Sequence, residues 1–427
     1  MNENITALKQ FLDKAHSVYH AVALLAADME KAGYSRLSEG EPWQLVPGGK
    51  YYLTRGGSSI IAFRIPQKTP EGIMISASHA DRPTFKVKEN GELVGAYTRL
   101  AVERYGGMLL APWLDRPLSI AGRVMVETEA GVEPRLLDID RDLLLIPNVA
   151  IHMNRNANEG YKWNPAVDLL PLVGSKDAAG KLWKLLEDAA GGKILGHDLY
   201  LYIRQEASVW GVEEEYISSA ALDDLECAWC CTQGFLQAEE GNALPLLCVF
   251  DSEEVGSAST QGAASTLLED VLNRICYSQG LQLRQLLNRT MLLSADNAHA
   301  MHPNHPEYSD STNAPLPGGG IVLKFNANQR YTTDGCTAAL FRKLCEKADV
   351  PVQTYCNRAD LPGGSTLGNI SLSHVSVLSA DIGLAQLAMH SCYETAGVQD
   401  VTYLVKAMAT FYGSCLAGDP ETGVKLA

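Results

Sequence analysis

The chain of 427 residues has no run of 18 consecutive apolar residues, so no membrane-spanning helix is expected. Its formal net charge is -15. This acidic balance disfavours binding to nucleic acids and to anionic membranes, because both need clustered Lys and Arg. The first residues are polar and acidic, and Leu8, Phe11, Leu12 and Ala15 then fall on one helical face. That pattern is typical of a docked amphipathic helix and not of a secretion signal, so we expect a cytoplasmic protein.

Cysteines and the common catalytic motifs are also scarce. Ten cysteines are too few for a disulfide scaffold in a chain of this length. Cys227 and Cys230 have the spacing of a zinc knuckle or a redox pair, but no second pair follows, and we interpret them as buried, reduced cysteines on a helix. The chain has no P-loop, no Gly-x-Gly-x-x-Gly after a strand, no His-Glu-x-x-His and no Gly-x-Ser-x-Gly.

What the sequence does contain is the composition of a soluble globular enzyme, with 46% hydrophobic and 20% charged residues. Its length allows two to three domains, or one large domain with an insertion. Short apolar runs recur along it, and ligand-type side chains follow each run. Residues 73–75 precede His79 and Asp81, residues 246–250 precede Asp251, Glu253 and Glu254, residues 291–293 precede Asp296 and His299, and residues 375–378 precede Asp381 and then His390.

Helical stretches lie between these runs, notably at residues 223–234 and 334–347. Buried strands that alternate with helices predict an α/β sheet covered on both faces. Sites in such sheets form at the carboxyl ends of the strands, so we expect the four strand ends to share one site. Asp and His also punctuate turns, which explains one or two such ends but not four.

Residues 85–211 have a different pattern. They contain Gly-rich turns, Tyr and Trp, and short alternating runs such as residues 119–126, which favour antiparallel β structure. We therefore expect a mixed-sheet α/β/α domain formed by residues 1–84 and 212–427, with a mainly-β domain inserted at residues 85–211.

The residues at the strand ends are those that a two-metal hydrolase needs. Hydrolysis of an amide at neutral pH needs an activated water, and two divalent ions about 3.5–4 Å apart can supply it. Such a pair needs a bridging carboxylate, further carboxylate or imidazole ligands, and a free carboxylate as general base. In His79-Ala80-Asp81, the carboxylate is placed to orient the imidazole. Of the adjacent Glu253 and Glu254, one can bind metal while the other faces the water.

The chain resembles the M18 family of metallo-aminopeptidases, the aspartyl aminopeptidase group, over essentially its whole length. The segments that carry the resemblance are Tyr19-His20-Ala21-Val22, Ser78-His79-Ala80-Asp81, Asp115-Arg116, Ile146-Pro147-Asn148-Val149-Ala150-Ile151-His152, Leu222-Asp223-Asp224-Leu225, Asp251-Ser252-Glu253-Glu254-Val255-Gly256-Ser257, Ser294-Ala295-Asp296-Asn297-Ala298-His299, Gln329-Arg330-Tyr331 and Gln386-Leu387-Ala388-Met389-His390-Ser391. Their order and spacing also match.

The resemblance implies a role for each matching residue. The terminal metal ligands would be His79, Glu254, Asp296 and His390, and Asp223 would be the bridging carboxylate. Glu253 would act as the general base, and Asp81 would orient His79. Two divalent ions are implied, with zinc expected and cobalt or manganese as alternatives, because carboxylate and imidazole ligands suit all three.

The resemblance also implies how substrate is bound. Lys324 and Tyr331 would line the pocket for the first side chain, with His299 close by. Lys324 lies in an apolar, strand-like run, where it is either an outward-facing residue or a cation aimed into a cleft. A buried ammonium needs an anionic partner, and an Asp or Glu side chain of the substrate would provide one. We therefore expect a preference for acidic N-terminal residues of short peptides, with neutral or apolar residues, which some members of the family prefer, as the alternative.

Assembly is the last implication of the resemblance. His152, on the inserted dimerisation domain, would reach the active site of a neighbouring subunit, although a structural loop histidine is the alternative. Dimers would assemble into a hollow tetrahedral dodecamer that admits only short peptides.

Three positions differ from the usual sequence of the family: Asp224 replaces Asn, Arg82 follows Asp81, and Pro117 follows Arg116. None removes a ligand, but Arg82 and Asp224 would change the local charge. Two other functions stay open. One is a metal-dependent amidase, deacylase or dipeptidase with the same site, and the other is a self-assembling shell protein without catalysis.

Overall fold

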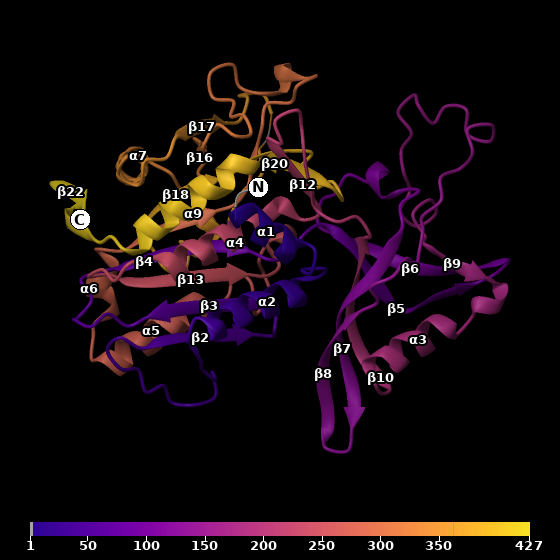
Figure 1. Ribbon diagram of the computed structural model, residues 1–427, viewed down its shortest axis with the longest axis horizontal. Helices are drawn as coiled ribbons and strands as arrows, with labels where there is room; N and C mark the ends of the chain where they lie inside the picture. Colours follow the sequence, from indigo (N-terminus) through magenta and orange to yellow (C-terminus); the bar gives the residue numbers. More distant parts are fainter. Residues whose placement is uncertain (1–2, 362) are drawn as a thin grey trace.

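The computed structural model describes residues 3–361 and 363–427. Its largest element is a nine-stranded mixed sheet with the strand order β1-β2-β3-β13-β4-β14-β18-β16-β17 (Figure 1). The strands are β1 (Ser35–Arg36), β2 (Lys50–Arg55), β3 (Ser59–Arg64), β13 (Leu244–Phe250), β4 (Ile73–His79), β14 (Met291–Ala295), β18 (Leu378–Gly383), β16 (Ile321–Phe325) and β17 (Val352–Cys356). The neighbours β13, β4, β14 and β18 are parallel, so their carboxyl ends lie at one edge.

Helices cover both faces of this sheet. One face is packed by α1 (Glu3–Leu12), α2 (Val18–Lys31), α4 (Leu222–Gln237), α7 (Gly335–Ala348) and α9 (Val398–Tyr412), and the other by α5 (Leu267–Gln279), α6 (Leu283–Leu287) and α8 (Leu367–Ser371). Side chains of β13 alternate between the two cores, with Leu247 and Val249 in one and Leu246 and Cys248 in the other. A strand buried on both faces has to be apolar throughout, which is the pattern of residues 246–250. The predicted mixed-sheet α/β/α class is confirmed.

A second sheet of six antiparallel strands lies beside the first (Figure 1). Its order is β8 (Gly131–Asp138), β7 (Leu118–Thr128), β10 (Ile194–Ile203), β5 (Thr84–Val94), β6 (Tyr97–Tyr105) and β9 (Leu172–Ser175). The helix α3 (Lys181–Ala190) packs on it through Leu182 and Leu186. The antiparallel structure expected in this part of the chain is present. The domain boundaries at 84/85 and 211/212 stay a prediction.

Smaller elements complete the fold. A five-stranded sheet has the order β11 (Ser208–Trp210), β12 (Tyr216–Ser219), β20 (Glu394–Gly397), β19 (Ala385–Leu387) and β15 (Ala298–His299), and β21 (Leu416–Asp419) pairs with β22 (Gly423–Leu426). The described residues also form the single-turn helices η1 (Ala111–Trp113), η2 (Lys176–Ala178), η3 (Glu253–Val255) and η4 (Pro306–Tyr308). Within residues 3–361 and 363–427, no helix has both the length and the apolar character needed to cross a membrane.

Most local predictions hold, and one is wrong. The first helix is amphipathic as expected, with Leu8, Phe11 and Leu12 buried. Cys227 and Cys230 are buried, free cysteines on α4. The apolar run at residues 375–378 was expected to be a strand, but β18 begins only at Leu378. Residues 375–377 follow α8 and pack against the core beside it. Asp381 therefore lies inside a strand and not at its end.

Candidate metal centre

Three of the predicted residues meet because their strands are parallel neighbours. His79 is the last residue of β4, Glu254 lies in the turn η3 directly after β13, and Asp296 follows β14. Asp223 comes from the start of α4, where its backbone is not helical (φ -80, ψ 108), and His390 comes from the turn after β19. Two sheets and one helix therefore supply the side chains of this cluster, which we call the acidic–histidine cluster.

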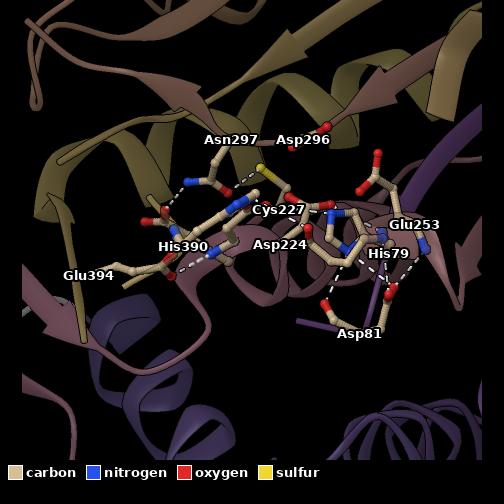
Figure 2. A network of polar contacts seen from close by, with 12 residues as sticks. His79, Asp81, Asp224, Cys227, Glu253, Asp296, Asn297, His390 and Glu394 are labelled. Atoms are coloured by element: carbon tan, nitrogen blue, oxygen red, sulfur yellow. Dashed lines mark hydrogen bonds and ion pairs between the residues drawn. The ribbon is translucent and has the colours of Figure 1, made fainter. Parts of the chain in front are cut away.

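Asp223 lies at the centre of the acidic–histidine cluster. Its Oδ1 lies 3.5 Å from His79 Nε2, and its Oδ2 lies 3.3 Å from His390 Nε2. His390 Nε2 is also 3.4 Å from Glu254 Oε2. Candidate ligand atoms of His79, Asp223 and Glu254 all lie within 4.8 Å of one another, and so do those of Asp223, Asp224 and Asp296. Figure 2 shows His79, Asp224, Asp296 and His390 gathered in one network.

The cluster has carboxylate oxygens without a hydrogen-bond partner. Among the residues that the structure describes, Oδ1 of Asp223, Oδ1 of Asp224 and Oε1 of Glu254 are buried and accept no hydrogen bond. Buried charges are costly unless they are paired or coordinate a metal. Carboxylate oxygens and imidazole nitrogens are also suitable ligands for zinc, so the residues present fit a divalent cation.

Burial raises the pKa values of two acids of the site, and the histidines lower that of a third. Burial raises the pKa of Glu253 to about 8, with Asp296 and Asp223 adding to the rise and His79 opposing it. Burial raises the pKa of Asp296 to about 6, against the opposing charge of Lys324. Burial also acts to raise the pKa of Asp223, but the neighbouring imidazoles of His390 and His79 outweigh it and hold that pKa below the usual value.

Asp81 holds both the first histidine and the turn after β13. His79 Nδ1 lies 3.1 Å from the Asp81 carbonyl oxygen and 3.4 Å from its Oδ1. The backbone N–H groups of Glu253 and Glu254 donate to the Asp81 carboxylate at 3.1 and 3.2 Å. The hydroxyl of Tyr105, at the end of β6, donates to the same carboxylate at 2.7 Å. One carboxylate thus connects His79, the two glutamates and the second sheet.

The residues expected to contact substrate lie in different surroundings. Lys324 is only 1% exposed, and its Nζ donates to the carbonyl oxygens of Asp296 and Asn297 at 2.7 and 3.2 Å. It therefore faces the segment after β14 and not solvent. The Tyr331 ring centroid lies 5.2 Å from this Nζ, so Tyr331 and Lys324 share one environment.

The two remaining histidines are exposed. His299 lies in β15, with its ring centroid 6.0 Å from that of Tyr355. His152 lies on the long segment between β8 and β9, and that segment lies on the side of the second sheet, away from the nine-stranded sheet (Figure 1). The structure therefore brings His79, Asp81, Glu253, Glu254 and the other predicted ligands together, but within one chain it does not bring His152 to them.

Sequence reasoning missed two residues around the cluster. Tyr105 bonds to Asp81, and Glu394 bonds to Asp223 and His390. Neither follows an apolar run that would have indicated a role for it. The guanidinium of Arg82 donates to the carbonyl oxygens of Ala15 and His16, and its predicted effect on the local charge stays a prediction. Asp224 lies in the cluster, and its Oδ2 accepts the backbone N–H of His79 at 3.1 Å.

Comparison with known proteins gives the family of the chain. The family model described as aminopeptidase I zinc metalloprotease (M18) matches residues 11–412. A probable M18 family aminopeptidase 2 from Clostridium novyi (strain NT) is 41% identical over 421 residues, covering 95% of this chain and 97% of the relative. The protein of the same name from Pseudomonas aeruginosa (strain LESB58) is 41% identical over 420 residues, again with 95% and 97% coverage.

Solved structures are similar over the same length. A chain in the cryo-EM structure of the Ape4 and Nbr1 complex is 36% identical with a TM-score of 0.93, covering 96% of this chain and 85% of that one. The structure of the Saccharomyces cerevisiae mApe1 dodecamer is 27% identical with a TM-score of 0.85 and 96% coverage of both chains. The family match spans nearly the whole chain, including every residue of the acidic–histidine cluster. The chain therefore belongs to the M18 family of zinc metalloproteases and is a metallo-aminopeptidase.

Proposed function

We propose that this enzyme uses two zinc ions to remove N-terminal residues, Asp or Glu by preference, from short peptides. The observation that carries the proposal is the arrangement around Asp223, whose two carboxylate oxygens face two different histidines at 3.5 and 3.3 Å. A carboxylate with a candidate ligand on each side is suited to bridge two ions. Zinc is the metal by which the family is described, and cobalt or manganese would bind to the same ligand types.

The distances favour one division of the ligands between the two ions. His390 and Glu254 lie 3.4 Å apart beside Asp223 Oδ2, and we assign them to one ion. His79 lies beside Asp223 Oδ1, and Asp296 groups with Asp223 and Asp224, so we assign His79 and Asp296 to the other ion. When bound, the ions would supply a water of lowered pKa and polarise the carbonyl of the scissile bond.

The protein would then manage the proton and the substrate. Glu253 would take the proton from the attacking water and pass it to the leaving amine. Asp81 would keep Glu253 in place through the backbone N–H that it accepts at 3.1 Å. The buried Lys324, beside Tyr331 and with His299 at the entrance, would pair with the acidic side chain of the substrate. Burial strengthens such a pair because the local dielectric constant is low.

Assembly and location form part of the same proposal. The solved Saccharomyces cerevisiae relative is a dodecamer, and we infer that this chain also forms homo-oligomers, with dimers assembling into a tetrahedral dodecamer. Residues 85–211 would form the dimerisation domain between the two parts of the catalytic domain, residues 1–84 and 212–427. The exposed His152 would act at the active site of a neighbouring copy. The ten cysteines are all free, as expected for a protein in the reducing cytoplasm.

One substrate panel tests the proposal. The enzyme is freed of metal with a chelator, and zinc, cobalt or manganese is added back. Aminopeptidase activity should return with two equivalents of zinc, with turnover highest for N-terminal Asp and Glu. Strong turnover of N-acyl substrates with little turnover of free peptides would favour an amidase instead. No turnover with any of the three metals would contradict the proposal and favour a shell protein.

A further inference from the structure

Glu394 touches the acidic–histidine cluster without belonging to it. It is the first residue of β20 and is only 1% exposed. Its Oε2 accepts the backbone N–H of Asp223 at 3.1 Å, and its Oε1 accepts the backbone N–H of His390 at 2.7 Å. Figure 2 shows Glu394 beside His390, at the end of the network away from Glu253. Both oxygens of this carboxylate are therefore used to hold two residues that lie 167 positions apart in sequence, from 223 to 390.

The backbone at both residues needs such a restraint. His390 has a φ of 66°, in the left-handed region that non-glycine residues seldom adopt unless the surroundings fix them there. The N–H of Leu109 donates to the carbonyl oxygen of His390 at 3.0 Å, so His390 is held on both sides. Asp223 stands at a non-helical position at the start of α4, where the regular helical hydrogen bonds do not fix its backbone.

We propose that Glu394 is a positioning residue that fixes the separation of Asp223 and His390, and so sets the zinc affinity on the His390 side. The inference rests on the proposed function, because it assumes that these two residues share an ion. Asp223 Oδ2 and His390 Nε2 are 3.3 Å apart, and both reach the cluster from backbone segments that bond to the same carboxylate. A zinc ion needs its ligands about 2.0–2.2 Å from the metal, so small movements of either backbone weaken binding.

A carboxylate is required at this position, and an amide of the same size would not replace it. A carboxylate can accept at both oxygens, whereas glutamine has one oxygen and one NH₂ group, which only donates. In Glu394→Gln, one of the two backbone N–H groups would face that NH₂ group and lose its acceptor. Loss of a residue that supports a metal ligand commonly lowers metal affinity by about 10- to 100-fold.

Asp400 offers a matched control for this substitution. It is fully buried, and its carboxylate also accepts two backbone N–H groups, from Gly318 at 2.6 Å and from Gly320 at 2.8 Å. Neither glycine belongs to the acidic–histidine cluster. Asp400→Asn therefore reproduces the chemical change of Glu394→Gln at a place that holds no predicted ligand.

The experiment measures zinc binding by the full-length oligomer. Wild type, Glu394→Gln and Asp400→Asn are stripped of metal and titrated with zinc against a chromophoric chelator, and cobalt-loaded samples are compared by their visible spectra. We expect wild type and Asp400→Asn each to bind two zinc ions, and the affinities of Asp400→Asn to equal those of wild type. For Glu394→Gln we expect one ion held about 10- to 100-fold more weakly and an altered cobalt spectrum.

The outcomes separate this inference from the proposed function. Two ions bound to Glu394→Gln as tightly as to wild type, with an unchanged spectrum, would overturn the role of Glu394. If wild type itself bound fewer than two ions, the proposed function would fail first. Should Glu394→Gln not fold, hydrogen exchange of wild type without zinc decides the matter. The His390 amide should then exchange slowly, and exchange at the rate of an unprotected loop would overturn the inference.

Discussion

The hydroxyl of Tyr105 offers a sharp test of how the second sheet supports the metal centre. Tyr105→Phe removes one oxygen and keeps the ring, which packs edge-on against the ring of Tyr200 with 5.7 Å between the ring centroids. The hydroxyl donates to Asp81 Oδ2 at 2.7 Å. Burial, followed by the charge of Asp81, raises the pKa of Tyr105 well above its usual value, so the phenol stays a donor throughout the working pH range.

The magnitude follows from the geometry of this bond. A hydrogen bond to a charged group contributes about 1.5–3 kcal/mol, and here the acceptor is 3% exposed, so water does not replace the lost donor. In the variant, the Asp81 carboxylate still accepts hydrogen bonds from the backbone N–H groups of Glu253 and Glu254. We therefore expect the carboxylate to rotate but to stay in its site. Because Glu253 moves with it, we expect kcat to fall about tenfold or more, with KM nearly unchanged.

Denaturant unfolding and steady-state kinetics measure the two effects on zinc-loaded enzyme. Tyr200→Phe is the matched control, because it removes a hydroxyl from the ring packed against Tyr105. We expect the control to keep wild-type kcat. If Tyr105→Phe kept both wild-type kcat and wild-type stability, or if only KM changed, the link from β6 through Asp81 to Glu253 would be refuted.

Two further predictions concern stability and specificity. Burial lowers the pKa of His20 from its usual 6.5 to about 4, so the unfolded chain binds a proton more readily than the fold below pH 6.5. The stability that His20 contributes is present above pH 6.5 and is lost as the pH falls toward 4, by about 3 kcal/mol at most. The free energy of unfolding of His20→Gln should therefore depend less steeply on pH in this range than that of wild type. An equal pH dependence of the two proteins would contradict the prediction. In Lys324→Met, kcat/KM for peptides with N-terminal Asp or Glu should decrease by a factor at least about 10-fold larger than kcat/KM for peptides with N-terminal Ala. Equal decreases for both kinds of peptide would exclude Lys324 from recognition of acidic residues.

Much of the fold and of the cluster could be predicted because each signal was local. Buried parallel strands are apolar throughout, so residues 246–250 were recognisable as a strand and Glu253 and Glu254 as residues at its end. The prediction of a strand at residues 375–378 was wrong because a short apolar run is also typical of a segment packed beside a helix, and periodicity does not distinguish the two.

The support around the cluster could not be predicted, because it depends on contacts between distant segments. Glu394 bonds to Asp223 across 171 positions, and Tyr105 reaches Asp81 from the second sheet. Nothing in the residues next to Arg82 indicated that its side chain would turn to the carbonyl oxygens of Ala15 and His16. Such partners follow from the tertiary fold and have no pattern of their own in the sequence.

The most direct test of the proposed two-zinc mechanism is the activity and zinc content of Glu253→Gln, measured on the same purified sample. Glutamine keeps the size of the side chain but cannot take a proton from water. We predict two zinc ions per chain, as in wild type, with kcat lowered by about 10²- to 10⁴-fold. Wild-type turnover in this variant, or loss of zinc together with turnover, would contradict the assignment of Glu253 as a base that does not bind the metal.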